Sequence, residues 1–464
     1  MKKIPVIHPF LFAVYPILFL FNFNKAQVPY HEMAAPIIIS LLMTGFALGF
    51  FTAILKNIQK AALITTGFLF LFFSYGHVHK KIWYQETHVL LLGVWLVLLL
   101  IVILAVSKLR KPTDTITQFL NVMTIVLIVM SGYDILRYET ALHKALRSAD
   151  KTEAEKSVSL NLTIPDPAPD IYHIVLDGYA SPSALETIYK YDNTPFYAFL
   201  KQNGFQVFEH NTTNYAVSFL SFASFLNMKY LNYLTDIEGK QSKNRRIPYE
   251  MIKNNPVMLK LKEHGYVFFH FSSGWGPTNS NKHADGDYCG GAFGVNEFRL
   301  VLIQTTLLRP FQHMLSSTMR ERILCSFATI QSLSSTKEPK YVFAHFLAPH
   351  PPYVFDQDGD PVEESALELE GDTWSDNQKY LDQLTYMTKR TEEMITAILA
   401  NASRPVVIWV HSDHGSEATF HNMQNDVWGG NAGAESFQER MKIFSTIHIP
   451  KEYSVNIPDG HSLV

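Results

Sequence analysis

Asp177, Asp413 and His414 are the residues whose types and positions point most directly to metal chemistry. Asp177 ends the apolar run "IYHIVLD", and Asp413 and His414 end the run "PVVIWVHSDH". A carboxylate beside an imidazole suits one divalent cation that accepts oxygen and nitrogen ligands. Manganese or zinc is therefore favoured, with magnesium and calcium as alternatives. Because Asp-Gly after a strand is also a common turn, Asp177 taken alone fits a turn as well.

The segment "NYAVSFLSFASFLN" places Ser218, Ser221 and Ser224 three residues apart among apolar side chains. Serines in an apolar helix are usually small packing residues. A serine in the first turn of a helix, however, lies where unpaired backbone N–H groups favour a phosphate-like anion. Metal coordination would also lower the pKa of its hydroxyl and make it a nucleophile. We therefore expect Ser218 to be the nucleophile and a fourth metal ligand, and the other two serines to pack inside the fold.

This chemistry requires that the candidate residues meet at one edge of a sheet. Apolar runs at 266–272, 341–348 and 405–413 predict further strands, and the segments between them predict helices. Strands that alternate with helices indicate an α/β domain with a central, largely parallel sheet. In such sheets ligands bind beyond the carboxyl ends of the strands. His345 lies inside one of these runs and is interpreted as a core histidine, whereas His411 is ambiguous.

The N-terminal part of the chain has the composition of a membrane anchor. Before Asp134 its only acidic residues are Glu32, Glu86 and Asp114. Core helices would need a polar outer surface, which so few charges do not supply. Bilayer spans need about 17–25 residues, and five apolar runs have this length: Val6–Phe23, Ala35–Leu55, Ala61–His77, Val89–Ser107 and Phe119–Leu136.

We therefore assign residues 1–138 to a five-span transmembrane domain, 139–169 to a juxtamembrane linker and 170–464 to an outer globular domain. If the N-terminus is cytoplasmic, most loop Lys and Arg residues face the cytoplasm, in agreement with the positive-inside rule. The outer domain then lies on the extracytoplasmic side of the membrane. A disulfide between Cys289 and Cys325 could persist there, but two unpaired cysteines fit equally well. The net charge of -3 gives no indication of a nucleic-acid partner.

Four motifs, in order along the chain, resemble the sulfatase-like branch of the alkaline phosphatase superfamily. They are "PDIYHIVLDGYAS", "TTNYAVSFLSFASFLNMKYL", "FAHFLAPHPPYVFD" and "VIWVHSDHGSE". The layout is similar to that of lipoteichoic acid synthases and phosphoethanolamine transferases, which have a five-span anchor and an extracytoplasmic catalytic domain. The resemblance implies that Ser218 replaces the usual threonine nucleophile and that His350 contacts the transferred group or stabilises the leaving oxygen. It also implies a catalytic metal on these ligands: Asp177, Asp413 and His414.

The resemblance leaves some features to be tested. The loop "SSGWGPT", with Trp275, is expected to line the substrate groove. Sulfatases form formylglycine within C/S-x-P-x-R, but Ser218 is followed by "FLSF" and lacks that Pro and Arg. Sulfate-ester hydrolysis by that route is therefore not expected. A single Asp before Gly178 favours one metal over two, and the ending "IPDGHSLV" suggests that a C-terminal piece is missing.

Together these features predict a membrane-anchored, metal-dependent phospho-group transferase or phosphodiesterase. It would act on lipid or glycan head groups through a covalent phosphoseryl intermediate, with membrane lipid and cell-envelope glycan as partners. One alternative is a sulfatase- or phosphatase-type hydrolase that uses the same site. The other is a catalytically inactive envelope protein that keeps the fold.

Overall fold

The structure is a computed structural model that describes all residues except 1–3, 83–87, 110–112, 157–161, 291–295, 334–335, 363–373, 375, 420–433, 454–456 and 464. The chain forms two compact units. The helical unit consists of Met1–Asp150 together with Val295–Leu315. The α/β unit consists of Lys151–Gly294 together with Ser316–Val464.

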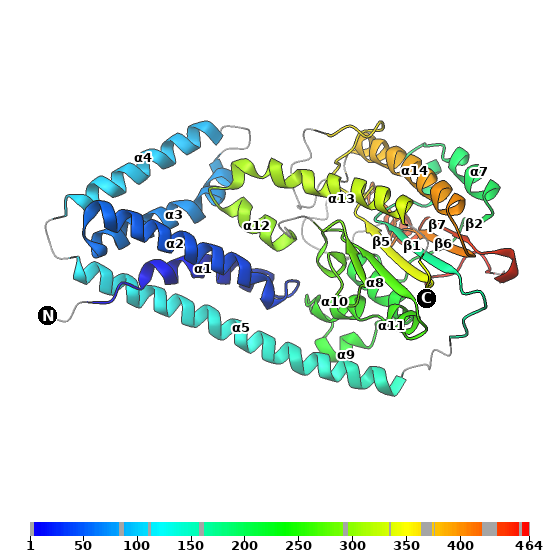
Figure 1. The fold of residues 1–464 in the computed structure, drawn as a ribbon, viewed down its shortest axis with the longest axis horizontal. Helices are drawn as coiled ribbons and strands as arrows, with labels where there is room; N and C mark the ends of the chain where they lie inside the picture. The colour runs from blue at the N-terminus through cyan, green and yellow to red at the C-terminus, as the bar shows by residue number, and fades with distance from the viewer. Residues whose placement is uncertain are drawn as a thin grey trace. The chain divides into compact units, whose positions relative to one another are not determined.

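The helical unit begins with a series of apolar helices (Figure 1). Helices α2 to α5 are long and apolar enough to cross a membrane, whereas α1 has 17 residues, near the lower limit for a span. The predicted anchor of apolar helices is thus confirmed. The helices are α1 (His8–Asn24), α2 (Ala34–Leu55), α3 (Ile58–Ile82), α4 (His88–Ser107) and α5 (Asp114–Lys156).

A segment from the middle of the chain completes the helical unit. It contains α12 (Glu297–Thr305) and the short helix η3 (Arg309–Phe311). Phe298 is buried in a cluster with residues of α1. A Cβ on Gly76 of α3 would lie 1.8 Å from the carbonyl oxygen of Gln304, so glycine is needed for this close approach of the two backbones. The hydrophobic periodicity of the sequence did not indicate this return to the helical unit.

The disulfide of the chain flanks this returning segment. Cys289 and Cys325, whose pairing the sequence left open, are bonded, and their Cα atoms are 5.8 Å apart. Both cysteines belong to the α/β unit. The disulfide therefore closes the loop through which the chain leaves the α/β unit and returns to it.

The α/β unit is built on a seven-stranded sheet with the order β2-β7-β6-β1-β5-β3-β4. Only β7 runs antiparallel to its neighbours, so the predicted largely parallel sheet is confirmed. The strands are β1 (Asp170–Leu176), β2 (Phe205–Phe208), β3 (Val267–Phe271), β4 (Gly286–Tyr288), β5 (Lys340–Phe346), β6 (Val406–His411) and β7 (Ser445–His448).

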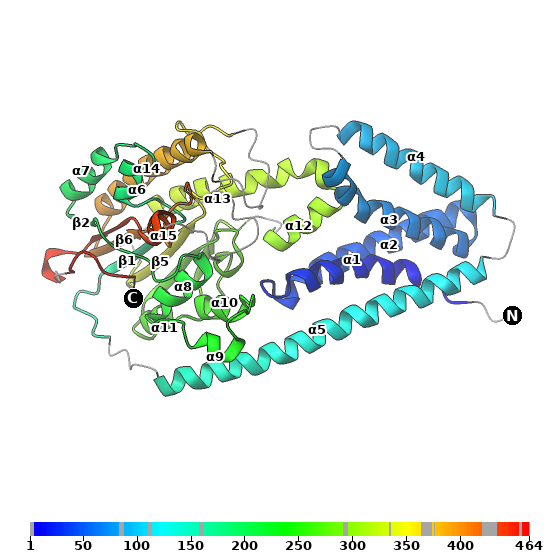
Figure 2. The ribbon, with the colours of Figure 1, turned by 180° about the vertical axis from the view of Figure 1, so that it is seen from behind.

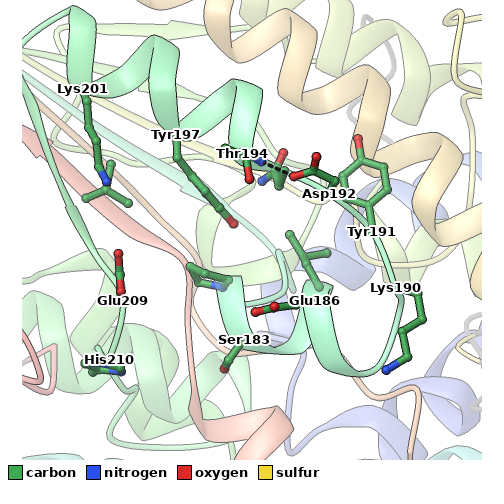
Figure 3. Close-up of a pocket in the computed structure, with 14 residues that line it drawn as sticks. Ser183, Glu186, Lys190, Tyr191, Asp192, Thr194, Tyr197, Lys201, Glu209 and His210 are labelled. Carbon is green, nitrogen blue, oxygen red and sulfur yellow. Dashed lines mark hydrogen bonds between the residues drawn. The ribbon is translucent and has the colours of Figure 1, made fainter.

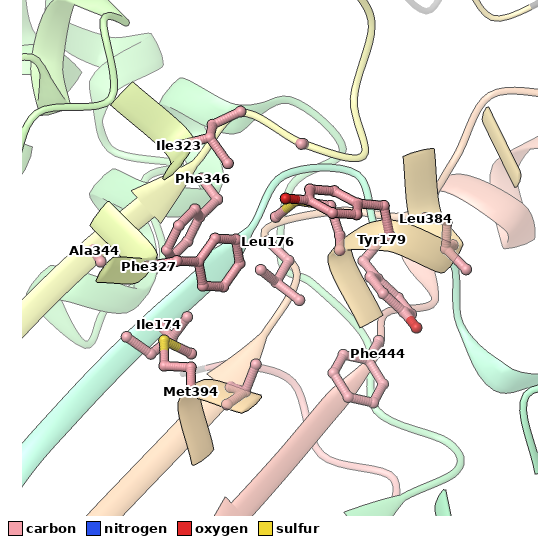
Figure 4. Packing of buried hydrophobic residues seen from close by; sticks show 14 of the residues in the cluster. Ile174, Leu176, Tyr179, Ile323, Phe327, Ala344, Phe346, Leu384, Met394 and Phe444 are labelled. Carbon is pink, nitrogen blue, oxygen red and sulfur yellow. The ribbon is translucent and has the colours of Figure 1, made fainter. Parts of the chain in front are cut away.

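Helices cover both faces of this sheet, as Figures 1 and 2 show. On one face, α13 (His313–Ser332) and α14 (Asn377–Ala400) pack against apolar strand residues such as Ile174 and Phe346 (Figure 4). The opposite face is covered in part by α8 (Ser218–Asn227). There the aromatic rings of α8 contact the histidines of the strands. Burial on both faces explains why the strands are almost continuously apolar.

Candidate metal and nucleophile site

Sheet order and register bring the predicted site residues together. Strand β1 lies between β6 and β5, and Val175 is level with both His411 and His345. Asp177 therefore leaves the sheet beside Asp413, which follows β6. This position is the carboxyl edge of parallel strands, where ligands of α/β proteins usually bind.

Asp177, Asp413 and His414 form a buried cluster with the composition of a metal site. One potential ligand atom from each lies within 4.8 Å of the others. His414 Nε2 is 3.5 Å from Asp177 Oδ1 and 3.3 Å from Asp413 Oδ2. Both of these carboxylate oxygens are buried and have no hydrogen-bond partner among the described residues. Because buried carboxylate oxygens are costly without a positive partner, the donor set fits a divalent cation.

Hydrogen bonds fix the tautomer of His414 in the form that binds metals. Its Nδ1 is 3.0 Å from the carbonyl oxygen of Gly415, which can only accept, so Nδ1 is the protonated nitrogen. Nε2 therefore presents a lone pair, towards which Arg440 Nη2 donates at 3.0 Å. Burial, followed by the charge of Arg440, lowers the pKa of His414 well below its usual value, which keeps the ring neutral. A backbone carbonyl that accepts from Nδ1 is the usual partner of a metal-binding histidine.

Arg440 is a site residue that the sequence analysis missed. Its guanidinium also donates to the carbonyl oxygens of Ala216 and Gly415, at 2.8 and 2.9 Å, and lies 3.1 Å from Glu417. It comes from α15 (Ala434–Met441), a short polar helix far along the chain from the motifs. No local pattern connected it with Asp413, because only the tertiary fold places it there.

The two buried carboxyl groups differ in their electrostatic surroundings. Burial, followed by the negative charge of Asp177, raises the pKa of Asp413 well above its usual value. Burial would also raise the pKa of Asp177, but the field of His350 and a hydrogen bond with His345 outweigh it and lower the pKa. Asp177 is thus the more readily ionised member of the pair. A cation bound between the two groups would favour the charged form of both.

Ser218 is the serine that reaches this cluster. It is the first residue of α8, and its Oγ lies 3.0 Å from His414 Nε2. The Ser218 hydroxyl and Arg440 Nη2 therefore share the one lone pair of that nitrogen as donors. Ser221 instead donates to the backbone oxygen of Asp413 at 2.7 Å, and Ser224 donates to that of Lys229 at 2.7 Å. The Ser218 hydroxyl therefore lies at the cluster, whereas the hydroxyls of Ser221 and Ser224 donate to backbone carbonyl groups.

His350 and His345 lie on the β5 side of the cluster. The backbone N–H of His350 donates to the carbonyl oxygen of Asp177 at 3.0 Å, and its ring centre is 6.1 Å from that of His414. His345 is buried, as expected for a core histidine, but its Nε2 also lies 3.4 Å from Asp177 Oδ2. The sequence analysis missed this contact. The contact depends on the pairing of β1 with β5, which places His345 opposite Val175 and so close to Asp177.

Trp275 lies beside His345 in an aromatic wall. The ring centres of these two residues are 5.5 Å apart, and Trp275 also contacts Phe222 and Tyr249 at 5.6 Å. Trp275 is partly exposed. The structure thus places the predicted groove residue near the cluster through His345, while its role in substrate binding stays a prediction.

His411 does not join the cluster. Its Nδ1 donates to the carbonyl oxygen of Ser412 at 2.9 Å, and its Nε2 is 2.8 Å from Nε2 of His173. His173 therefore donates to His411, and its own Nδ1 accepts from the hydroxyl of Tyr341 at 3.2 Å. Every ring nitrogen of this pair has a partner, so the ambiguous His411 is a satisfied core histidine.

A separate hollow lies beside α6 (Pro182–Thr187) and α7 (Thr194–Gln202) and has a volume of about 670 Å³. Figure 3 shows that it is bordered by Tyr197 and Lys201 of α7 and by Glu209 and His210 after β2. None of the cluster residues lines it. Its mixture of acidic, basic and aromatic side chains does not identify a ligand.

The chain is similar to several proteins of known structure. Among solved structures, the chain is similar to the zinc complex of the C-terminal periplasmic domain of EcEptC from Escherichia coli, with 15% identity, a TM-score of 0.40 and coverage of 64% of this chain and 79% of that one. It is also similar to the lipooligosaccharide phosphoethanolamine transferase A (EptA) from Neisseria meningitidis, an integral membrane protein, with 10% identity, a TM-score of 0.37 and coverage of 98% and 93%. The putative sulfatase yidJ from Bacteroides fragilis shows 14% identity, a TM-score of 0.37 and coverage of 66% and 73%.

No curated protein matches the sequence. A model of the Sulfatase family, in contrast, matches residues 169–445, which is more than half of the chain and includes all the candidate site residues. On this match, the chain belongs to the Sulfatase family.

Proposed function

We propose that this chain is a membrane-anchored, metal-dependent phospho-group transferase or phosphodiesterase that uses Ser218 as its nucleophile. The principal support is one arrangement: Ser218 Oγ lies 3.0 Å from His414 Nε2, beside two buried carboxylate oxygens without partners among the described residues. A hydroxyl at the start of a helix is also close to backbone N–H groups that favour an anion.

Asp177, Asp413 and His414 would hold one divalent cation, with manganese or zinc preferred. The cation would lower the pKa of the Ser218 hydroxyl and offset negative charge on the phosphate. Ser218 Oγ would then form a bond to phosphorus while the bond from phosphorus to the leaving alcohol breaks. An acceptor hydroxyl or water would attack the phosphoseryl group in a second step and regenerate the free serine.

His350 is the residue proposed to assist the leaving group. Its Nδ1 donates to the carbonyl oxygen of Pro351 at 2.5 Å, so its Nε2 is available for the substrate. A protonated Nε2 would give its proton to the leaving oxygen, and the neutral ring would deprotonate the acceptor in the second step. The backbone hydrogen bond from His350 N–H to the carbonyl oxygen of Asp177 holds this ring near the proposed metal ligands.

The apolar helices suggest that the substrate is a lipid. A phospholipid would supply the phospho group and leave as diacylglycerol, and an envelope glycan, a lipid or water would accept the group. The distribution of positive loop residues supports a cytoplasmic N-terminus and an α/β unit on the periplasmic side of a bacterial inner membrane. Anchoring the enzyme at the surface that contains its substrate supplies proximity, which lowers the barrier of a bimolecular reaction.

One observation favours a second candidate, an inactive envelope protein. Arg440 directs its guanidinium at the nitrogen that a metal would use. A guanidinium can neutralise the cluster in place of a metal, and such a protein would keep the fold without turnover. A purified chain that binds no metal would favour the inactive protein, and so would a chain that binds metal but shows neither a phosphoseryl adduct nor turnover.

The decisive experiment is the intact mass of the full chain in detergent, loaded with manganese or zinc and incubated with a mixed phospholipid extract. The expected result is a metal-dependent adduct on Ser218 whose mass identifies the transferred group. Ser218→Ala should show no adduct at any metal concentration. If metal binds but neither an adduct nor hydrolysis of a chromogenic phosphodiester is observed, the proposed function is wrong.

A further inference from the structure

Trp374 lies beside the candidate site, in the α/β unit, but is not one of the groups assigned to the reaction. It precedes α14 in the chain and is 8% exposed. Its indole lies against three parts of the site: the ring of His350, the turn after Asp177 and the guanidinium of Arg440. A buried ring with these three neighbours is placed to control the geometry of the site.

The turn after Asp177 leaves room for the indole because it contains glycine. Gly178 has a φ of +67°, which glycine adopts without strain, and a Cβ there would lie 2.8 Å from Cη2 of Trp374. On α14, the hydroxyl of Tyr380 donates to the carbonyl oxygen of Gly178 at 2.9 Å, and its ring centre lies 5.5 Å from that of Trp374. The indole is therefore held between α14 and the residue that follows the proposed metal ligand Asp177.

The ring of His350 contacts the indole at a steep angle. The two ring centres are 4.9 Å apart and the ring planes are inclined by 80°, which is the edge-to-face geometry that aromatic rings prefer. The backbone beside this ring is fixed, because Gln383 of α14 donates to the carbonyl oxygens of Pro349 and His350 at 3.2 Å. Among the described residues, the ring itself makes one hydrogen bond, from Nδ1 to Pro351. A single hydrogen bond does not fix the tilt of a ring, so the contact with the indole supplies the second restraint.

The same indole contacts the arginine beside the proposed metal ligands. Arg440 Cζ lies 5.8 Å from the centre of the Trp374 ring, within the range of a cation–π contact. Its Nη2 donates to His414 Nε2 at 3.0 Å. Trp374 therefore connects the His350 side of the site with the Arg440 side through one rigid ring.

We propose that Trp374 is a positioning residue that keeps Nε2 of the His350 ring directed at the oxygen of the leaving alcohol. The inference rests on the role proposed for His350 and does not depend on which phospho group is transferred. Transfer of a proton needs a donor about 2.6–3.2 Å from the acceptor, so a ring that tilts away loses its effect on the rate. Removal of the indole therefore slows reactions whose leaving oxygen needs a proton and spares those whose leaving oxygen does not.

The test compares two substrates of the full, metal-loaded chain in detergent. One is the mixed phospholipid extract, from which the leaving group is diacylglycerol, an alcohol that needs a proton. The other is bis(p-nitrophenyl) phosphate, whose leaving nitrophenolate is stable without one. Trp374→Leu should lower the release of diacylglycerol about a hundredfold, as expected for a displaced catalytic group, and the release of nitrophenol by less than about threefold. A purely structural role would lower both rates by the same factor.

A milder substitution and a matched control complete the comparison. Trp374→Phe keeps an aromatic face, so it should lower diacylglycerol release only a few-fold, and it carries the test if Trp374→Leu does not fold. Trp409 is the control, because its ring stacks on His411 at 4.2 Å and contacts the satisfied histidine pair rather than the site. Trp409→Leu should leave the ratio of the two rates unchanged.

A double variant shows whether Trp374 acts through His350. His350→Gln should lower diacylglycerol release and spare nitrophenol release, because it removes the acid. Adding Trp374→Leu to His350→Gln should cause no further loss, since no catalytic ring is left to position. A further loss as large as that of Trp374→Leu alone would show that Trp374 acts independently of His350 and would overturn the inference.

The two histidine and tryptophan variants also separate failure of this inference from failure of the proposed function. If His350→Gln discriminates between the substrates but Trp374→Leu lowers both rates equally, Trp374 is a packing residue and the proposed function stands. If His350→Gln does not discriminate between them, the role of His350 and the inference are both wrong, whereas the assignment of Ser218 is unaffected. A parent chain that turns over neither substrate would overturn the proposed function and the inference together.

Discussion

Two groups of buried polar residues, one within the sheet and one beyond its strand ends, differ in how their polar atoms are satisfied. In the pair His173 and His411, every ring nitrogen has a hydrogen-bond partner. Beyond the ends of the same strands, Asp177 and Asp413 each keep a buried oxygen without a partner among the described residues. Both groups are therefore buried, and they differ in whether each polar atom has a hydrogen-bond partner. A satisfied network stabilises a core, whereas buried oxygens without a protein partner are suited to binding a cation.

The largest expected difference is between Ser218 and Ser224, which lie on one helix. Ser218→Ala should reduce turnover of a phosphodiester at least about a thousandfold, because it removes the nucleophile. Ser224→Ala should change turnover little, because Ser224 contacts only the fold. Steady-state kinetics with metal-loaded chains measure both. Equal effects of the two substitutions would contradict the assignment of Ser218.

Metal binding provides the next comparison. Asp413→Asn should weaken manganese or zinc binding by more than about a hundredfold, because it removes a charged ligand. Asp287 makes a carboxylate–imidazole contact of 2.9 Å with His270 outside the cluster, so Asp287→Asn is the matched control and should leave metal binding unchanged. Isothermal titration after chelator treatment measures both affinities. Similar affinities of Asp413→Asn and the parent would show that the ion binds elsewhere.

The satisfied histidine pair should affect stability rather than activity. Burial, followed by the proximity of His411, lowers the pKa of His173 well below its usual value, and burial lowers that of His411 to about 4. The unfolded chain therefore binds more protons, so the pair's contribution is complete above the unfolded pKa of about 6.5 and is lost as the pH falls below it. Thermal unfolding between pH 7 and 5 should show this loss of stability. In His173→Phe the loss of stability between these pH values should be smaller. Turnover of this variant at pH 7.5 should stay within about twofold of the parent value. The same pH slope in both chains would contradict this role.

The smallest effect is expected at Ser221, which stabilises the loop of the metal ligands. Its hydroxyl donates to the backbone oxygen of Asp413 and lies 2.9 Å from Thr213 Oγ1. Ser221→Ala should lower the free energy of unfolding by about 1–2 kcal/mol, because it leaves these buried groups without a partner. Denaturant titration of the unfolding transition of the α/β unit measures this change. A thousandfold loss of turnover with unchanged stability would instead place Ser221 in the reaction.

The sequence by itself determined the class of each part of the chain. Scarcity of charge over long apolar runs requires a lipid environment, and alternating short strands and helices require an α/β sheet. Local patterns predicted the positions of three site residues. Asp177 and Asp413 each follow a buried apolar strand, and Ser218 precedes an apolar helical segment.

Only the tertiary structure decided which polar groups share a site. Asp177, Ser218, His414 and Arg440 come from separate elements of the fold. Strand order and register bring the ends of β1 and β6 together, and the packing of α8 and α15 adds Ser218 and Arg440. The same holds for the disulfide between Cys289 and Cys325 and for the return of α12 to the helical unit. Sequence patterns report the periodicity of a single element. Contacts between elements, such as that of Arg440 with His414, depend on how the elements pack.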